Sequence, residues 1–249
     1  MEHLLIFATI NLVASILSGA SGGGASLVGV PLMILLGLPP ATAIATSKFS
    51  GLGLATGSSA RFYREKLTNR QTVIVFALLG AVGGAVGSTF LVRVGVKHQD
   101  VLQHITGCAI LVVGIPMLYI RNIGIEQKKR STPVHALGYV LVFLLVALQA
   151  ALSSGMGSLQ SIVMMACFGM TALTASATRR AMQLIVAVTS LTILLFAGIP
   201  SWQFGLVALP TAILGSFIGA HIAVKKGNKF VINIFAITSF ILALQLLWR

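Results

Sequence analysis

The sequence predicts an all-α polytopic membrane protein made of two inverted repeats, with broken or re-entrant helices at equivalent positions. Composition is the first observation behind this prediction. Of 249 residues, 57% are hydrophobic and only 8% are charged, whereas a soluble domain carries about a quarter charged residues. The second observation is that the chain matches itself at one constant offset, the one that aligns Gly37 with Gly169.

Apolar runs alternate with short polar stretches along the whole chain. They fall at 4–18, 25–38, 42–60, 71–92, 101–120, 136–152, 158–170, 174–197, 202–223 and 230–248. A helix needs about 20 residues to cross a membrane. The runs 25–38 and 158–170 are too short for that, and we expect them to form half-helices or re-entrant segments.

The internal match defines two halves. At this repeat offset, "GLPPATAIATSK" (37–48) falls on "GMTALTASATRR" (169–180), and "GGAVG" (83–87) falls on "GSFIG" (215–219). We therefore divide the chain into a first transmembrane repeat at 1–120, a basic cytoplasmic linker at 121–135 and a second transmembrane repeat at 136–249.

Loop charge predicts that the halves are inverted. The loop 61–70 carries four basic residues, and its repeat mate at 193–202 carries none. Lys and Arg gather in cytoplasmic loops, which places 61–70, 121–131 and 225–229 in the cytoplasm and 198–201 outside. Many secondary transporters have such inverted repeats, with the substrate site between the halves.

The charge balance does not indicate nucleic acid. The net charge is +13, but loop Lys and Arg account for it in a membrane protein. Cys108 and Cys167 lie in apolar runs and no Cys/His cluster has the spacing of metal ligands, so we expect no metal site. No nucleophile–base pair or phosphate-binding loop appears either, so we expect neither an enzyme nor a cofactor.

Three consecutive glycines, Gly22 to Gly24, interrupt the first apolar region. Irregular backbone within a membrane is tolerated only where protein buries it or a polar cavity meets it. A helix that resumes near Ser26 would point unpaired N–H groups into the break, and such helix N-termini bind anions. "SSGMGS" (153–158) occupies the same place in the second half. The alternative is that these glycines only allow close helix packing, which is our interpretation of "GGAVG" and "GSFIG".

Basic residues form the second constellation, in "ATSK" (45–48) and "ATRR" (177–180), where Lys48 aligns with Arg180. We expect each to start a helix and the two to approach one another near a pseudo-two-fold axis. A basic residue within an apolar run is costly and usually functional. The alternative is that both lie at the membrane surface and set topology.

None of the four carboxylates lies in the middle of an apolar run, so the expected pocket is cationic and its ligand an anion. The candidate substrate-binding residues are Ser21, Gly22, Gly23, Gly24, Ser26, Thr46, Ser47, Lys48, Ser154, Gly155, Thr178, Arg179 and Arg180.

"SGGGASLVGVPLMILLGLPPATAIATSK", the "YREKLT" that follows it, and the repeat of this block resemble the sulfite exporter TauE/SafE family, also called the toluene sulfonate uptake permease family. The resemblance covers nearly the whole chain, and "ASATRR" is similar to uncharacterised inner-membrane members. It implies transport of sulfur-containing anions such as sulfite, sulfonates or sulfoacetate. The second glycine-rich break is reduced here to "SSGMGS", so the halves are not expected to contribute equally.

We therefore expect a multi-pass permease of the cell inner membrane, in contact with lipid, that moves a small sulfur-containing oxyanion. An inside-negative potential drives anions outward, so export needs no coupling carboxylate. Two alternatives stay open: a lipid-phosphate translocase, and a membrane scaffold without transport activity. The sequence leaves the oligomeric state undetermined.

Overall fold

A computed structural model describes residues 2–21, 25–68, 70–95, 124–152 and 156–247. The regular elements in these ranges are all helical, which confirms the predicted class. They are α1 (Glu2–Ser21), α2 (Ala25–Leu35), α3 (Pro40–Arg64), α4 (Arg70–Phe90), the π-helical turn η1 (Leu91–Gly95), α6 (Thr132–Leu152), α7 (Gly157–Phe168), α8 (Ala172–Phe196) and α9 (Trp202–Leu247).

Helix boundaries repeat along the chain as the sequence match requires. α2, α3 and α4 begin at Ala25, Pro40 and Arg70, and the repeat offset carries these positions to the starts of α7, α8 and α9. The starts agree without any shift for α7, α8 and α9. α2 and α7 have 11 and 12 residues. At about 1.5 Å per residue they are too short to cross a membrane, as predicted for the two short runs.

Five of the described helices are long and apolar enough to cross a membrane. The segments are His3–Ala20, Gln71–Val94, Thr132–Leu152, Ala172–Phe196 and Trp202–Ile234. α3 has 25 residues but buries polar side chains, including Thr46, Ser47 and Lys48. A polar helix of this kind is stable in a membrane only inside a bundle, and α3 contacts α1, α2, α8 and α9.

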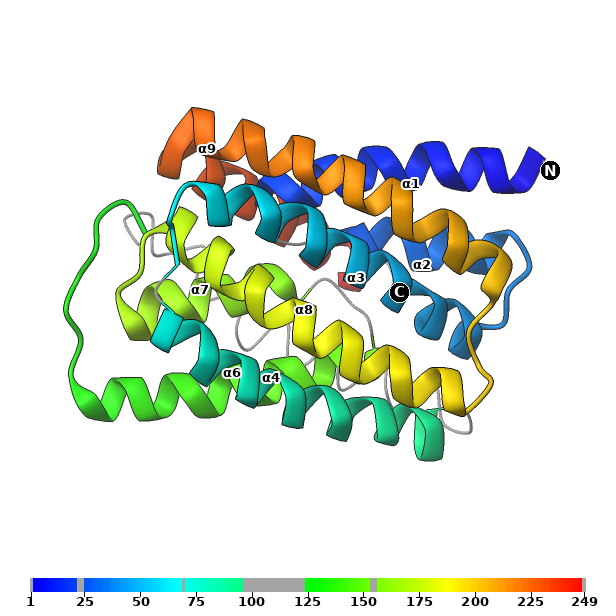
Figure 1. The fold of residues 1–249 in the computed structure, drawn as a ribbon, viewed down its shortest axis with the longest axis horizontal. Coiled ribbons are helices and arrows are strands. Elements are labelled where there is room, and N and C mark those ends of the chain that lie inside the picture. The colour runs from blue at the N-terminus through cyan, green and yellow to red at the C-terminus, as the bar shows by residue number, and fades with distance from the viewer. Residues whose placement is uncertain (1, 22–24, 69, 96–123, 153–155, 248–249) are drawn as a thin grey trace.

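The two halves exchange their fourth helices. α1 and α3 pack against α9 from the second half, whereas α6 and α8 pack against α4 from the first. Figure 1 shows the resulting layers, with α1, α2, α3 and α9 above and α4, α6, α7 and α8 below. α3 contacts α8 across the boundary between the layers. α3 and α8 run in opposite directions in this view, and so do α1 and α6.

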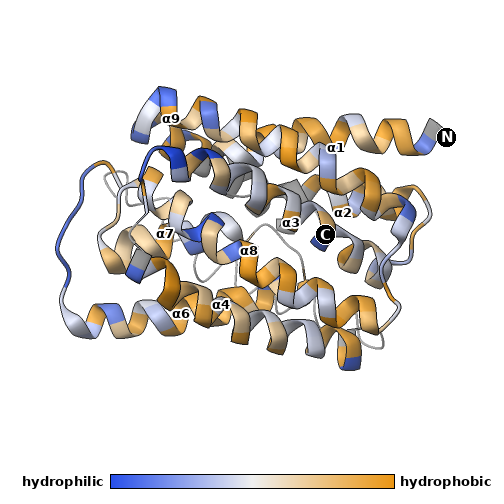
Figure 2. Cartoon of the chain, in the orientation of Figure 1, coloured by the Kyte–Doolittle hydropathy of each residue, from blue (hydrophilic) through white to orange (hydrophobic). Residues whose placement is uncertain are grey.

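Basic segments gather at one end of the bundle. The loop after α3, the segment 124–131 and the break in α9 at Gly227 lie together, while the loops 36–39 and 197–201 lie at the other end (Figure 1). Asn228 joins α9 to the segment 124–131 and to the start of α8, because its side-chain amide donates to the Ile125 carbonyl at 3.1 Å and accepts from the Leu173 N–H at 3.0 Å. Figure 2 shows hydrophilic residues at this end and largely hydrophobic helix exteriors.

Glycines allow the closest helix contacts, as predicted for "GGAVG" and "GSFIG". A Cβ at Gly219 would collide with the backbone of Ile16 on α1, and a Cβ at Gly87 would collide with the backbone of Ala147 on α6. Gly87 and Gly219 are repeat mates, so both halves join a first and a fourth helix in the same way.

We expect Gly219→Ala to lower the free energy of unfolding by about 1–3 kcal/mol, because the added methyl group separates α1 from α9. Gly29→Ala is the matched control, since its Cβ would lie 3.8 Å from Asn11 Oδ1 and meet nothing closer. Thermal unfolding in detergent micelles measures both. Equal melting temperatures for the two variants would contradict the close contact.

Candidate functional site

Lys48 and Arg180 lie inside helices, whereas we predicted that each would start a helix. Each follows the first residue of its helix, Pro40 or Ala172, by about two turns. Their exposed fractions are 7% and 2%, and that of Arg179 is 1%. The cation-bearing turns are therefore enclosed by protein, which argues against the membrane-surface alternative.

Each of these two cations bonds to the end of a helix from the other half. Lys48 Nζ donates to the Gln149 carbonyl of α6 at 2.9 Å. Arg180 Nη2 donates to the Ser18 carbonyl of α1 and to Ser18 Oγ, the latter at 3.0 Å. Both carbonyls are among the last four of their helices, which have no partner within the helix. A cation there also interacts favourably with the helix dipole.

Helices α1 and α6 are therefore interrupted inside the protein. α1 ends at Ser21 and α2 begins at Ala25, while α6 ends at Leu152 and α7 begins at Gly157. The predicted binding residues Gly22, Gly23, Gly24, Ser154 and Gly155 lie outside the described residues, and so do the side chains of Ser21 and Ser26. Their role stays a prediction.

Buried polar atoms without partners gather on α8. Among the described residues, Arg179 Nε and Nη2, Arg180 Nε and Thr178 Oγ1 have no hydrogen-bond partner. The described part of the chain contains one ion pair, Arg61 with Glu65 at the basic end. Burial of a cation without a partner is costly, so α8 holds hydrogen-bond donors that a bound anion would satisfy.

The first-half hydroxyls are already used within the protein. Thr46 Oγ1 donates to the Thr42 carbonyl at 2.6 Å and accepts from the Ser201 N–H at 2.9 Å. Ser47 Oγ donates to the Ile44 carbonyl at 2.7 Å. In this arrangement neither hydroxyl has a hydrogen to donate to a ligand, whereas Thr178 does.

Sequence reasoning missed a chain of three glutamines. Gln160 Nε2 donates to Gln149 Oε1 at 2.6 Å, and Gln149 Nε2 donates to Gln183 Oε1 at 3.1 Å. The carbonyl of Gln149 is the one that Lys48 holds. Gln183 lies one turn beyond Arg179 on the same face of α8. The chain therefore connects the Lys48 contact to the turn of α8 that follows the arginines.

The repeat itself contained a signal for these glutamines. At the repeat offset they align with Leu17, Val28 and Gly51, none of which has a polar side chain. Gln160 is fully buried and its Oε1 has no partner among the described residues. A buried amide with an unsatisfied atom in only one repeat is an exception to the usual pairing of buried polar groups, and it marks a candidate site.

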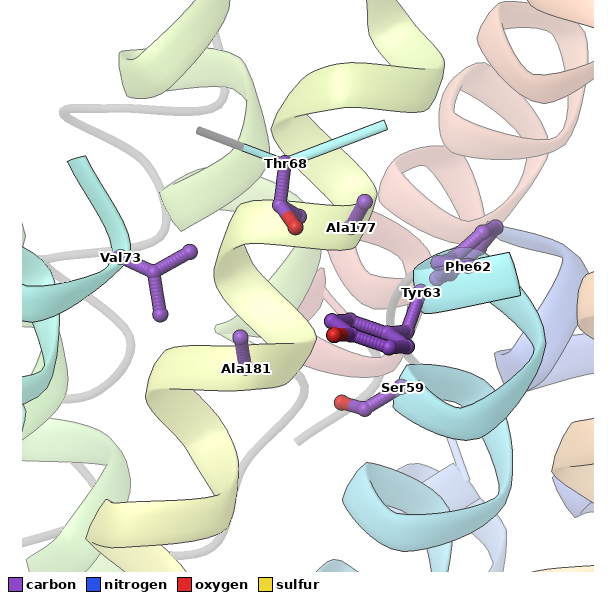
Figure 3. A pocket seen from close by; sticks show the side chains of 7 residues that line it. All are labelled: Ser59, Phe62, Tyr63, Thr68, Val73, Ala177 and Ala181. Carbon is purple, nitrogen blue, oxygen red and sulfur yellow. The ribbon is translucent and has the colours of Figure 1, made fainter. Parts of the chain in front are cut away.

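A pocket of about 430 Å³ lies between α3 of one layer and α4 and α8 of the other. Figure 3 shows its lining side chains: Ser59, Phe62 and Tyr63 from α3, Thr68 from the following loop, Val73 from α4, and Ala177 and Ala181 from α8. The two alanines flank Thr178, Arg179 and Arg180 in the chain, so the pocket lies against the same turn of α8, although the lining itself contains none of these three residues.

Comparison with known proteins gives a consistent result. A family model described as "Sulfite exporter TauE/SafE" matches residues 7–246. A "Probable membrane transporter protein" of Haemophilus influenzae is 26% identical, over 100% of this chain and 96% of its own. "Probable membrane transporter protein YfcA" of Escherichia coli K12 is 23% identical, over 96% and 87%. "Sulfite exporter TauE/SafE family protein 6" of Arabidopsis thaliana is 26% identical over 48% of this chain and 26% of its own.

Removing the charge of Arg179 and removing that of Arg180 should have opposite effects on the stability of the protein. Arg180→Met should lower the melting temperature, because the Ser18 carbonyl loses a charged hydrogen-bond partner. Arg179→Met should raise the free energy of unfolding by about 1 kcal/mol or more, because an apolar side chain replaces a buried cation with unpaired donors. Thermal unfolding without added anions tests this, and destabilisation by Arg179→Met would contradict its unpartnered state.

Proposed function

Because the chain belongs to the sulfite exporter TauE/SafE family and is a multi-pass membrane transporter, we propose that it is an inner-membrane permease. Its substrate is a small sulfur-containing oxyanion such as sulfite, a sulfonate or sulfoacetate. The observation that carries this proposal is that three buried cations, Lys48 on α3 and Arg179 and Arg180 on α8, have no carboxylate partner among the described residues.

The chemistry of these buried side chains favours an oxyanion as the ligand. Arg179 and Arg180 both retain unpaired N–H groups, and Thr178 adds a hydroxyl. Guanidinium groups bind tetrahedral and planar oxyanions through parallel N–H donors, and charge-assisted hydrogen bonds of this kind are strong. An anion between them would also compensate the cost of burying these positive charges.

Charge also favours export. The two carboxylates whose side chains are described, Glu65 and Glu126, are exposed. A transporter that works against the potential needs a coupling ion and ligands for it, and intramembrane carboxylates are common ones. An inside-negative potential moves each negative charge outward with about 2.3 kcal/mol per 100 mV. Export of an anion therefore runs on the potential alone.

The arrangement of the helices also supports the proposed function. The opposite directions of α3 and α8 in Figure 1 fit repeats of opposite orientation in the membrane. The interrupted helices α1 and α6 point their ends toward cations of the opposite half. Secondary transporters place their substrate between such discontinuous helices.

Proteoliposome flux is the direct test. With radiolabelled sulfite or sulfoacetate, a potential of about 100 mV should drive a concentration gradient of roughly fiftyfold for each negative charge that the transported anion carries. Lys48→Ala and Arg180→Ala should each reduce the rate by about tenfold to a hundredfold, because a hydrogen bond to a charged group contributes about 1.5–3 kcal/mol.

Lys225→Ala is the matched control, since it removes a positive charge from an exposed position on α9. If none of the three variants alters the flux, the protein is still a permease, but Lys48 and Arg180 are excluded as its substrate site. No flux of any sulfur anion, together with a lipid that copurifies with the protein, would favour a lipid-phosphate translocase.

Binding can be measured apart from transport. An anion at about 100 times its dissociation constant should stabilise the folded protein by about 2.7 kcal/mol. Sulfite should therefore raise the melting temperature of the Lys225→Ala control and not that of Arg179→Met. A shift that persists unchanged in Arg179→Met would place the anion elsewhere.

A further inference from the structure

The pocket in Figure 3 has an equivalent location at the other end of the bundle, which the repeat defines. Each lining residue has a repeat mate in the other half, one repeat offset later in the chain for residues of the first half and one offset earlier for those of the second. These mates define the equivalent location. The pairs are Ser59 and Leu191, Phe62 and Leu194, Tyr63 and Leu195, Thr68 and Pro200, Val73 and Gly205, Ala177 and Ala45, and Ala181 and Phe49.

Hydrophobic side chains fill this equivalent location. Phe49 is only 5% exposed and belongs to one buried cluster with Leu191. Its ring lies against Gly205, where a Cβ would come within 2.6 Å of it. The ring also meets Trp202 edge to face, with 5.7 Å between the ring centres. Leu194 is fully buried beside Ala45.

Two residue exchanges account for the difference between the ends. Where the filled end has the phenyl ring of Phe49, the open end has the methyl group of Ala181. Where the open end has Val73, the filled end has Gly205, whose missing side chain makes room for that ring. The difference between the open and the filled end therefore results from the sequence and not from helix movement alone.

The two locations face opposite ends of the protein. The pocket is lined by Thr68, from the basic loop between α3 and α4. Phe49 packs on Trp202, directly after the loop 197–201 at the other end. If charge sets the orientation as proposed, the pocket opens to the cytoplasm and Phe49 lies toward the outside.

We propose that Phe49 is a built-in plug on the outer side of the anion site and that the pocket bordered by Ser59 and Ala181 is the cytoplasmic entrance. This inference rests on the proposed export of an anion. The substrate enters past Ser59, which lines the pocket, and reaches the arginine turn of α8. Release outward requires the Phe49 ring to move aside.

Cysteine labelling tests the plug without any substrate. In a background with Cys108 and Cys167 replaced by alanine, Ser59→Cys and Leu191→Cys place single thiols at repeat-equivalent positions. A membrane-impermeant maleimide should label Ser59→Cys from the cytoplasmic face and leave Leu191→Cys unlabelled from the outer face. Adding Phe49→Ala should speed labelling of Leu191→Cys by about tenfold or more, because the reagent needs an accessible thiolate.

A reciprocal variant and a matched control keep the test decisive. Ala181→Phe should slow labelling of Ser59→Cys by about tenfold, because it places a ring where the pocket is open. Phe7→Ala removes an equally buried ring from the same cluster, on α1, and should leave labelling of Leu191→Cys unchanged. Phe49→Leu replaces Phe49→Ala if the latter does not fold.

Outcomes separate the plug from the proposed function. Equal labelling of Leu191→Cys with and without the Phe49→Ala substitution would overturn the plug, whatever the flux of sulfite. Acceleration by Phe49→Ala but not by Phe7→Ala would establish it even if no sulfur anion were transported. Faster outward flux in Phe49→Ala proteoliposomes, together with faster labelling, would support both.

Discussion

Pairing the carbonyl ends of two interrupted helices is the constraint on which the rest of this structure depends. α1 and α6 end inside the protein, where an unpaired carbonyl costs free energy that water cannot recover. Lys48 and Arg180 supply donors, and each reaches a helix of the other repeat. The exchange of α4 and α9 between the layers joins the two halves further. Neither repeat is therefore complete without the other.

This structural role does not account for all of the buried positive charge. Lys48 and one nitrogen of Arg180 are satisfied by helix ends, whereas Arg179 has two unpaired donors. Its repeat mate is Ser47, whose hydroxyl bonds within its own helix. The second half thus carries an additional cation, and the glutamine chain lies beside it. Such groups lower stability, and proteins retain destabilising features of this kind mainly at functional sites, which supports the proposed anion ligand.

Hydropathy and the internal match predicted the fold class, the short second helices and the position of the repeat. These signals depend only on the sequence. Close packing at Gly87 and Gly219 followed from small-residue spacing. The partners of Lys48 and Arg180 could not be predicted, since they depend on how helices far away along the chain enter the bundle. Nor could the glutamine chain, because each of its members is isolated in an apolar run and only folding brings the three together.

The residues that differ between the two repeats make the two ends of the protein unequal. Two identical inverted halves would offer the same entrance and the same affinity from both faces of the membrane. Here Arg179 replaces a serine, three glutamines replace apolar residues or glycine, and Ala181 replaces a phenylalanine. In the proposed permease, the first two changes add donors for an anion, and the third opens the end that carries the basic loops. All three changes lie in the second half. The proposed loading from the basic end and the proposed release past Phe49 therefore depend on residues that break the repeat, while the repeat itself supplies the framework.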